Sequence, residues 1–184
     1  MSTHEAVVFL IEGFEEIEAI TTIDILRRAG IKTASVSLTG KYEVFGSRSI
    51  TVMADKIFDD LKDVKGTMLI LPGGPGTANY KKHEILLELL KMHNNNGEHI
   101  AAICAAPTIL GMLGLLKDKT AVCYPSLEAE LNAKEIGMAS VVTDGNITTS
   151  RGPATSTDFA LEIVRIIKGL ESAGAVAEAL LYAG

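Results

Sequence analysis

Hydrophobic residues in this chain gather in short runs, and between the runs they recur every three or four positions. Uninterrupted runs suit strands that are buried on both faces of a parallel sheet, whereas the longer period is that of an amphipathic helix. The pattern predicts core strands at Ala6–Ile11, Lys32–Leu38, Thr67–Leu71 and Ile100–Ile103. Strands that alternate with helices indicate a mostly parallel sheet covered by helices on both sides, and therefore an α/β fold.

Helix signals fill the segments between these strands. The first helix, Glu15–Ala29, begins with acidic residues and ends with basic ones, which suits the helix dipole. Its predicted buried stripe consists of Ile17, Ile20, Ile23 and Leu26. Further helices are predicted at His83–His93, Ala106–Leu113, Thr155–Lys168 (with Thr155 as its cap and Asp158 three residues on) and Ser172–Tyr182.

Two segments carry hairpin signals. Val44–Val52, around Gly46, predicts an accessory β excursion outside the core sheet. Val141–Thr149 contains Asp144-Gly145, a strong signal for a tight turn between antiparallel strands.

Length and composition limit the functional classes. The chain has 184 residues, of which 47% are hydrophobic and 22% charged, so we expect one globular domain over 1–184. The net charge of −6 disfavours nucleic acid and anionic membranes as partners. No secretory signal or membrane-spanning run is visible, and two cysteines without a signal suggest a reducing compartment. The expected location is therefore the cytoplasm.

Cys104 stands where chemistry is expected in such a sheet. It directly follows the strand Ile100–Ile103 and precedes a helix, so it projects from the carboxyl edge of the sheet, where sites form in open α/β folds. The helix N-terminus favours thiolate over thiol, which makes a cysteine nucleophilic. The alternative is a buried, inert cysteine, which the spacing alone leaves equally open.

Glu18 and a glycine-rich turn fall at the same edge. A carboxyl group held near a thiolate in an apolar site has a raised pKa and, once protonated, can donate to sulfur. The alternative for Glu18 is a solvated acidic first turn, which the bare sequence favours. The turn Pro72-Gly73-Gly74-Pro75-Gly76 can bring backbone N–H groups to an oxyanion, but by itself it also suits a simple tight turn.

The histidines argue against a cysteine hydrolase, which needs a histidine beside its nucleophile. His99 lies at the opposite end of its strand, His4 precedes the first strand, and His83 and His93 flank a predicted surface helix. None is an obvious partner of Cys104, although folding can still bring His83 near.

Four motifs together resemble the ThiJ/PfpI superfamily, in particular the deglycase-like branch that includes the Parkinson-disease protein. They are Phe14-Glu15-Glu16-Ile17-Glu18, Leu71-Pro72-Gly73-Gly74, Ala101-Ala102-Ile103-Cys104-Ala105-Ala106-Pro107 and Thr149-Ser150-Arg151-Gly152-Pro153. The resemblance runs from about Val7 to Val176. It implies a flavodoxin-like three-layer sandwich that forms a homodimer and needs no cofactor or metal.

The resemblance also implies roles for single residues. Cys104 corresponds to the reactive cysteine on a strained strand–helix elbow, and Glu18 to the protonated carboxyl at its sulfur. Gly73, Gly74 and Ala105 correspond to the backbone groups of an oxyanion pocket. Arg48 corresponds to an arginine that approaches the pocket from the partner subunit, and Arg151 to one that lies close by.

The chain departs from relatives at two positions. The peptidase branch has histidine directly after the cysteine, where this chain has Ala105, so a protease is disfavoured. Tyr124 stands where the deglycase-like branch often has a pocket histidine, which puts any histidine-assisted step in doubt. Cys123 is a candidate resolving thiol for Cys104, but packing is the favoured interpretation.

Two classes of function follow. The first is an enzyme for small reactive carbonyls, of the glyoxalase or protein deglycase type, in which Cys104 attacks an aldehyde and Glu18 moves protons. The second is an oxidative-stress sensor or chaperone in which Cys104 is oxidised to a sulfinate. A thiazole-biosynthesis or amidotransferase-like role is the weakest of the three. The expected ligand is a small carbonyl compound or anion, held with the help of Arg48, Arg151 and Tyr124.

Overall fold

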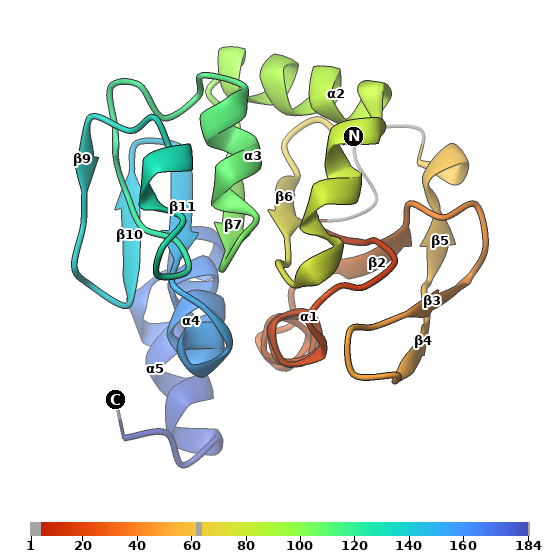
Figure 1. Cartoon of the computed structure of the whole chain (residues 1–184). Helices are drawn as coiled ribbons and strands as arrows, with labels where there is room; N and C mark the ends of the chain where they lie inside the picture. Colours follow the sequence, from red (N-terminus) through yellow and green to blue (C-terminus); the bar gives the residue numbers. More distant parts are fainter. Residues whose placement is uncertain (1–4, 62–63, 184) are drawn as a thin grey trace.

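The structure, a computed structural model, describes residues 5–61 and 64–183. A seven-stranded sheet runs through it in the order β10-β11-β7-β6-β1-β2-β5 (Figure 1). In chain order its strands are β1 (Ala6–Leu10), β2 (Thr33–Ser37), β5 (Lys56–Ile57), β6 (Met68–Leu71), β7 (Ile100–Ile103), β10 (Val141–Asp144) and β11 (Ile147–Ser150). All neighbouring strands pair in parallel except β10 and β11. The structure therefore confirms a flavodoxin-like α/β sandwich with a mostly parallel sheet.

Helices form the two outer layers. They are α1 (Glu16–Arg28), α2 (Glu84–Asn95), α3 (Pro107–Met112), α4 (Ser156–Lys168) and α5 (Leu170–Ala179). Helices α1, α4 and α5 pack together on one face, while α2 and α3 belong to the core of the other. Short 3-10 segments add η1 (Phe58–Asp60), η2 (Pro75–Lys82), η3 (Glu128–Glu130) and η4 (Pro153–Thr155).

Strand β1 shows why its sequence is an uninterrupted hydrophobic run. Ala6, Val8 and Leu10 belong to one core cluster, and Val7 and Phe9 belong to the other. Successive side chains of a strand point to opposite faces, so a central strand with helices on both sides needs apolar residues at every position.

Two small sheets lie outside the main one. β3 (Glu43–Phe45) and β4 (Thr51–Met53) form an antiparallel hairpin, which confirms the predicted accessory excursion. β8 (Thr120–Ala121) pairs with β9 (Glu135–Ile136). Strands of two residues, such as β5, β8 and β9, are too short to show a periodic pattern, and the sequence did not predict them. The sequence did not predict the 3-10 segment η2 either. The predicted hairpin around Asp144-Gly145 is confirmed as β10 and β11.

The predicted stripe of α1 is wrong at its first two positions. Ile23 and Leu26 are buried, but Ile17 and Ile20 are exposed. The buried face of the first two turns is instead made by Glu18, Ala19 and Thr22, because the start of this helix packs against polar turns.

Two helix boundaries also differ from expectation. Thr155 makes no side-chain cap to α4, because its hydroxyl donates to the carbonyl of Gly152 (2.9 Å) and belongs to the turn before the helix. Helix α5 begins at Leu170 and ends at Ala179, earlier than the predicted Ser172–Tyr182. Within residues 5–61 and 64–183, no helix combines the length and apolar character needed to span a bilayer.

Candidate active site

Cys104 follows β7 on a sharp elbow at the carboxyl edge of the sheet. Its φ of +64° is a left-handed conformation that non-glycine residues rarely adopt, and holding it costs about 1–3 kcal/mol. Main-chain hydrogen bonds hold the elbow on both sides. The Cys104 N–H donates to the carbonyl of Ser150 (2.9 Å), and its own carbonyl accepts from the N–H of Tyr124 (2.8 Å). The end of β11 and the backbone of Tyr124 thus hold the cysteine in this strained conformation.

Glu18 lies in the first turn of α1 and is completely buried. The Gly73 N–H donates to its Oε2 at 2.7 Å. Among the described residues, Oε1 has no fully formed hydrogen bond. The neighbouring thiol of Cys104 nevertheless interacts with this carboxyl group, because each affects the pKa of the other. The structure therefore brings Glu18 and Cys104 together, as the motifs implied.

Burial controls the charge of Glu18. It raises the pKa of this carboxyl from 4.5 to about 7, while hydrogen bonds from Cys104 and Gly73 oppose the rise and the charge of Glu15 adds to it. A carboxyl group with such a pKa exchanges its proton near neutral pH, as a general acid or base requires.

Burial also raises the pKa of the Cys104 thiol, to about 12, and the charge of Glu18 and the hydrogen bond to it act in the same direction. The N–H groups of Gly74 and Ala105 oppose this rise. Our expectation that a helix N-terminus favours the thiolate was therefore incomplete, since α3 has only six residues and burial outweighs the N–H groups. When Glu18 binds a proton, its charge no longer opposes the thiolate, and its hydroxyl can donate to the sulfur.

The glycine turn after β6 is shaped by close packing. A Cβ on Gly73 would lie 2.7 Å from Cβ of Cys104 and 2.9 Å from the Ala105 nitrogen. Gly74 has a φ of +102°, and a Cβ there would lie 2.5 Å from the Glu15 nitrogen. The Gly73 N–H, a predicted donor of the oxyanion pocket, donates to Glu18 in this structure. The backbone donors next to the sulfur are those of Gly74 and Ala105.

Tyr80 of η2 also holds the glycine turn in place through hydrogen bonds. Its hydroxyl is fully buried and lies 3.1 Å from the carbonyl oxygens of both Phe9 and Pro72. Burial and the charge of Glu18 both raise the pKa of this phenol, so it stays protonated. Tyr80 therefore ties the ends of β1 and β6 together beneath the site.

The acidic start of α1 is not a solvated turn. Glu15 and Glu16 are buried along with Glu18. The Glu16 carboxylate accepts the N–H of Arg48 (2.6 Å) and the hydroxyl of Ser47 (3.0 Å). It therefore anchors the β3–β4 hairpin to α1, and these hydrogen bonds lower its pKa despite its burial. Sequence reasoning missed this role because the partners lie more than thirty residues away.

The predicted anion-binding residues lie around the elbow in different settings. The Arg48 guanidinium is mostly exposed and lies 4.0 Å from the Glu15 carboxylate of its own chain. Arg151 is partly buried, and its backbone N–H donates to the carbonyl of Ser140 (3.3 Å). Tyr124 is half exposed, with its ring against Gly152, where a Cβ would lie 3.3 Å away.

Cys123 has the environment of a packing residue. It is buried in the core on the α2–α3 side of the sheet, and its Sγ donates to the carbonyl of Tyr124 (3.3 Å). Burial, together with the charges of Glu128 and Glu130, raises the pKa of its thiol to about 12.

Of the three histidines that the structure describes, none has Cys104 among its hydrogen-bond or ion-pair partners. His93 is fully buried, with Nε2 2.6 Å from the Thr67 carbonyl and Nδ1 2.9 Å from Glu98, so the prediction that it flanks a surface helix is wrong. His99 precedes β7, at the opposite edge of the sheet. His83 lines a separate cavity beside Leu38, and His4 lies outside the described residues.

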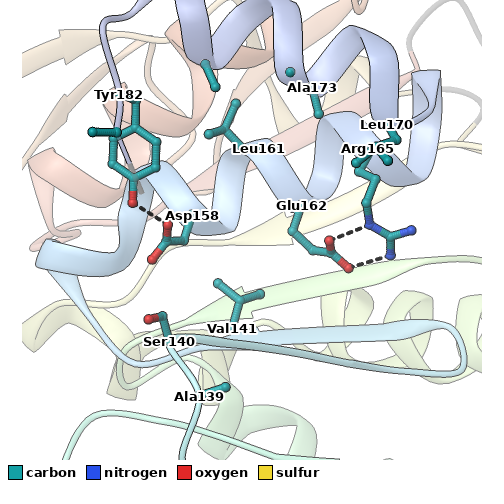
Figure 2. A pocket seen from close by; sticks show the side chains of 13 residues that line it. Ala139, Ser140, Val141, Asp158, Leu161, Glu162, Arg165, Leu170, Ala173 and Tyr182 are labelled. Carbon is teal, nitrogen blue, oxygen red and sulfur yellow. Dashed lines mark hydrogen bonds and ion pairs between the residues drawn. The ribbon is translucent and has the colours of Figure 1, made fainter.

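A separate hollow does not contain this site. It is an open groove of about 790 Å³ between α4, α5 and the segment that leads into β10 (Figure 2). The Tyr182 hydroxyl donates to Asp158, and Glu162 pairs with Arg165 at 2.7 Å, so these polar groups have partners within the chain (Figure 2). Cys104 and its buried neighbour Glu18 are not among the residues that line this groove.

The fold and site define a class of α/β protein that carries a cysteine on a strand–helix elbow beside a buried carboxyl group. Residues 4–166 match the model of the DJ-1/PfpI family, and the chain belongs to that family. It is 40% identical over 181 residues to the Drosophila melanogaster protein dj-1beta, covering 97% of each chain. The crystal structure of Drosophila DJ-1beta superposes with a TM-score of 0.92 at 37% identity, covering 100% of both chains.

Two further relatives carry functional information in their names. A Caenorhabditis elegans protein named glutathione-independent glyoxalase DJR-1.2 is 30% identical over 175 residues, covering 94% of this chain and 92% of its own. A structure of oxidized Toxoplasma gondii DJ-1 superposes with a TM-score of 0.92 at 35% identity, covering 99% of this chain and 100% of its own.

Proposed function

We propose that the chain is a cofactor-independent enzyme for small reactive carbonyls, of the glyoxalase or deglycase type. The observation that carries the proposal is the pair formed by Cys104 and the fully buried Glu18, a nucleophile next to a carboxyl group that exchanges its proton near neutral pH. The name of the nematode relative agrees with this chemistry.

The reaction is written for a 2-oxoaldehyde such as methylglyoxal. The Cys104 sulfur bonds to the aldehyde carbon, and the aldehyde oxygen receives the proton that the pair shared, which gives a hemithioacetal. Glu18, now a carboxylate, takes the proton from that carbon and returns one to the neighbouring carbon. The hydroxyl proton of the hemithioacetal passes to the oxygen of the neighbouring carbon, which leaves a thioester of the 2-hydroxy acid. Water cleaves the thioester, releases lactate and restores the thiol. The sum is methylglyoxal plus water to lactate, without an oxidant or reductant.

The backbone donors suit this sequence of steps. The N–H groups of Gly74 and Ala105 lie at the sulfur, next to the oxygen that becomes negative when the thiolate adds to the carbonyl. Glu18 is held by the Gly73 N–H through Oε2, so Oε1 is the oxygen available for proton transfer.

The test is lactate formation from methylglyoxal by the purified protein. We expect turnover to fall at least about 100-fold in Cys104→Ala and in Glu18→Gln, since each removes a group that acts in the reaction. Cys123→Ala is the matched control and should keep wild-type turnover. Lactate formation that survives Cys104→Ala would refute the mechanism.

A second candidate, oxidation sensing, is favoured by the donors around the sulfur. Two equivalents of peroxide convert a thiolate to a sulfinate with release of two water molecules, and the N–H groups of Gly74 and Ala105 can donate to the new oxygens. A protonated Glu18 adds a further donor. The oxidized state is on record for the Toxoplasma relative. Such a sensor can act as a redox-controlled chaperone.

Mass spectrometry separates this candidate from the first. Limited peroxide should add two oxygens to Cys104, and Glu18→Leu should lower the yield of that species because the donor is lost. An unchanged product distribution in Glu18→Leu would remove Glu18 from the oxidised site.

We also propose that the chain forms a homodimer through α1 and the β3–β4 hairpin. Main-chain and side-chain hydrogen bonds join these two elements. Their exposed apolar side chains are Ile17, Ile20, Phe45, Ile50 and Met53. Burial of this surface against a second copy would remove it from water. Arg48 lies on the same hairpin with its guanidinium 4.0 Å from Glu15 of its own chain, so in such a dimer it would stand between its own site and that of the partner.

Sedimentation tests the dimer, and calorimetry tests the anion site. We expect a dimer that Ile17→Asp dissociates, and binding of lactate that weakens in Arg48→Ala and Arg151→Ala. A wild-type monomer would refute the first statement. Equal affinity in all three proteins would refute the second.

A further inference from the structure

Glu15 and the carboxyl group of Glu18 are both hydrogen-bonded to the backbone of one residue, Gly73. The Glu15 N–H donates to the carbonyl of Gly73 (2.9 Å), and the N–H of Gly73 donates to Glu18 (2.7 Å). Glu15 also stands three positions before Glu18, a spacing that puts two side chains on the same side of a helix. Its carboxylate is buried, so water screens its charge poorly.

The charge of Glu15 is only partly offset by its neighbours. The Ser47 hydroxyl, a neutral group, donates to its Oε2 (3.1 Å). The Arg48 guanidinium is 4.0 Å away, and 70% of that side chain is exposed. Glu16 differs, because its carboxylate accepts hydrogen bonds from Ser47 and from the N–H groups of Arg48 and Ile50. Glu16 therefore holds the hairpin, whereas Glu15 keeps negative charge next to the site.

The groups that face Glu18 come from four elements. They are Cys104 after β7, Gly73 after β6, Tyr80 of η2 and Glu15 at the start of α1. Among these neighbours, Glu15 carries a negative charge without taking part in the proton transfer. Its charge disfavours the carboxylate of Glu18, in agreement with the raised pKa of Glu18.

We propose that Glu15 is a positioning residue that sets the pH range in which Cys104 and Glu18 share their proton. The hairpin turn Ser47-Arg48 adjusts this range by offsetting part of the Glu15 charge. The inference rests on the proposed proton-sharing pair, and it adds a link from the hairpin to the reactivity of the cysteine.

The test is the pH dependence of Cys104 alkylation by iodoacetamide, measured without any carbonyl substrate. Glu15→Gln should lower the midpoint by about one pH unit, the size expected for one charge at helix i,i+3 distance in a partly screened site. Arg48→Ala should raise the midpoint by a few tenths of a unit, since it removes an opposing positive charge. Glu12→Gln, an exposed carboxylate just before α1, is the matched control and should leave the midpoint unchanged.

Opposite shifts are the result that a merely structural role would not produce. The inference would be overturned if both substitutions shift the alkylation midpoint in the same direction, or if Glu15→Gln leaves the midpoint unchanged. If Glu15→Gln does not fold, the test rests on Arg48→Ala, which replaces an exposed side chain. An unchanged alkylation midpoint in Arg48→Ala then refutes the proposal. The infrared carboxyl band of Glu18 in a Cys104→Ala background should shift in the same directions. A protein that forms no lactate but shows these shifts would refute the proposed enzyme and keep this inference.

Discussion

Replacing Glu18 by glutamine should stabilise the folded chain at pH 8 and change its stability little near pH 4. The folded state holds a proton on Glu18 up to about pH 7, whereas the unfolded chain releases it near 4.5. Between these values the folded state binds more protons, so the free energy of unfolding falls as the pH rises. Glutamine removes this dependence because it does not titrate, and its amide can still accept from the Gly73 N–H.

The magnitude follows from the shift of the Glu18 pKa. A rise from 4.5 to about 7, at about 1.4 kcal/mol per pKa unit, corresponds to about 3 kcal/mol of stability lost above pH 7. In a chain of this length each kcal/mol moves the melting temperature by about 2–4 °C. The gain of Glu18→Gln at pH 8 should therefore approach about 10 °C and disappear at low pH.

The assay is urea unfolding from pH 4 to pH 8 for the wild type and three variants. Glu12→Gln controls for the loss of an exposed negative charge and should follow the wild type. Glu16→Gln should show the opposite sign, because hydrogen bonds lower the pKa of Glu16 and its contribution is present at neutral pH and lost on acidification. A difference between Glu18→Gln and the wild type that stays constant across this range would refute the raised pKa of Glu18.

Three further experiments test the packing and reactivity of the site. Gly73→Ala should cost about 1–3 kcal/mol in urea unfolding, since its Cβ would meet Cys104 at 2.7 Å, whereas Gly174→Ala, with open space around it, should be neutral or stabilising. Tyr80→Phe should cost about 1–3 kcal/mol, because two buried carbonyls lose the hydroxyl at 3.1 Å; an unchanged unfolding curve would contradict this. Thiol labelling followed by peptide mapping should modify Cys104 before Cys123, and the reverse order would reassign the nucleophile.

The hydrophobic pattern was enough to predict the central architecture. Apolar runs such as Ala6–Ile11 suit a strand with a core on both faces, so the parallel sheet and its covering helices could be predicted from local sequence. The position of Cys104 between the run Ile100–Ile103 and the next helix likewise placed it at the carboxyl edge. The tight turn Asp144-Gly145 encoded the antiparallel hairpin by its backbone preferences alone.

The surroundings of the site depended on partners distant in the chain. The acidic turn at Glu15, Glu16 and Glu18 looks solvated in sequence, and only the approach of Ser47 and Gly73 buries it. A carboxyl group's pKa depends on its desolvation and on its donors, and neither can be read from neighbours along the helix.

The exposed side of α1 was decided in the same way. Ile17 and Ile20 fit a helical stripe, yet they are exposed, because the polar turns that pack on the start of the helix select its Glu18 face. Local sequence therefore determined the long core strands, the main helices and the place of the cysteine between them. The tertiary structure decided which groups lose their water around that cysteine, because burial arises only when distant segments pack together.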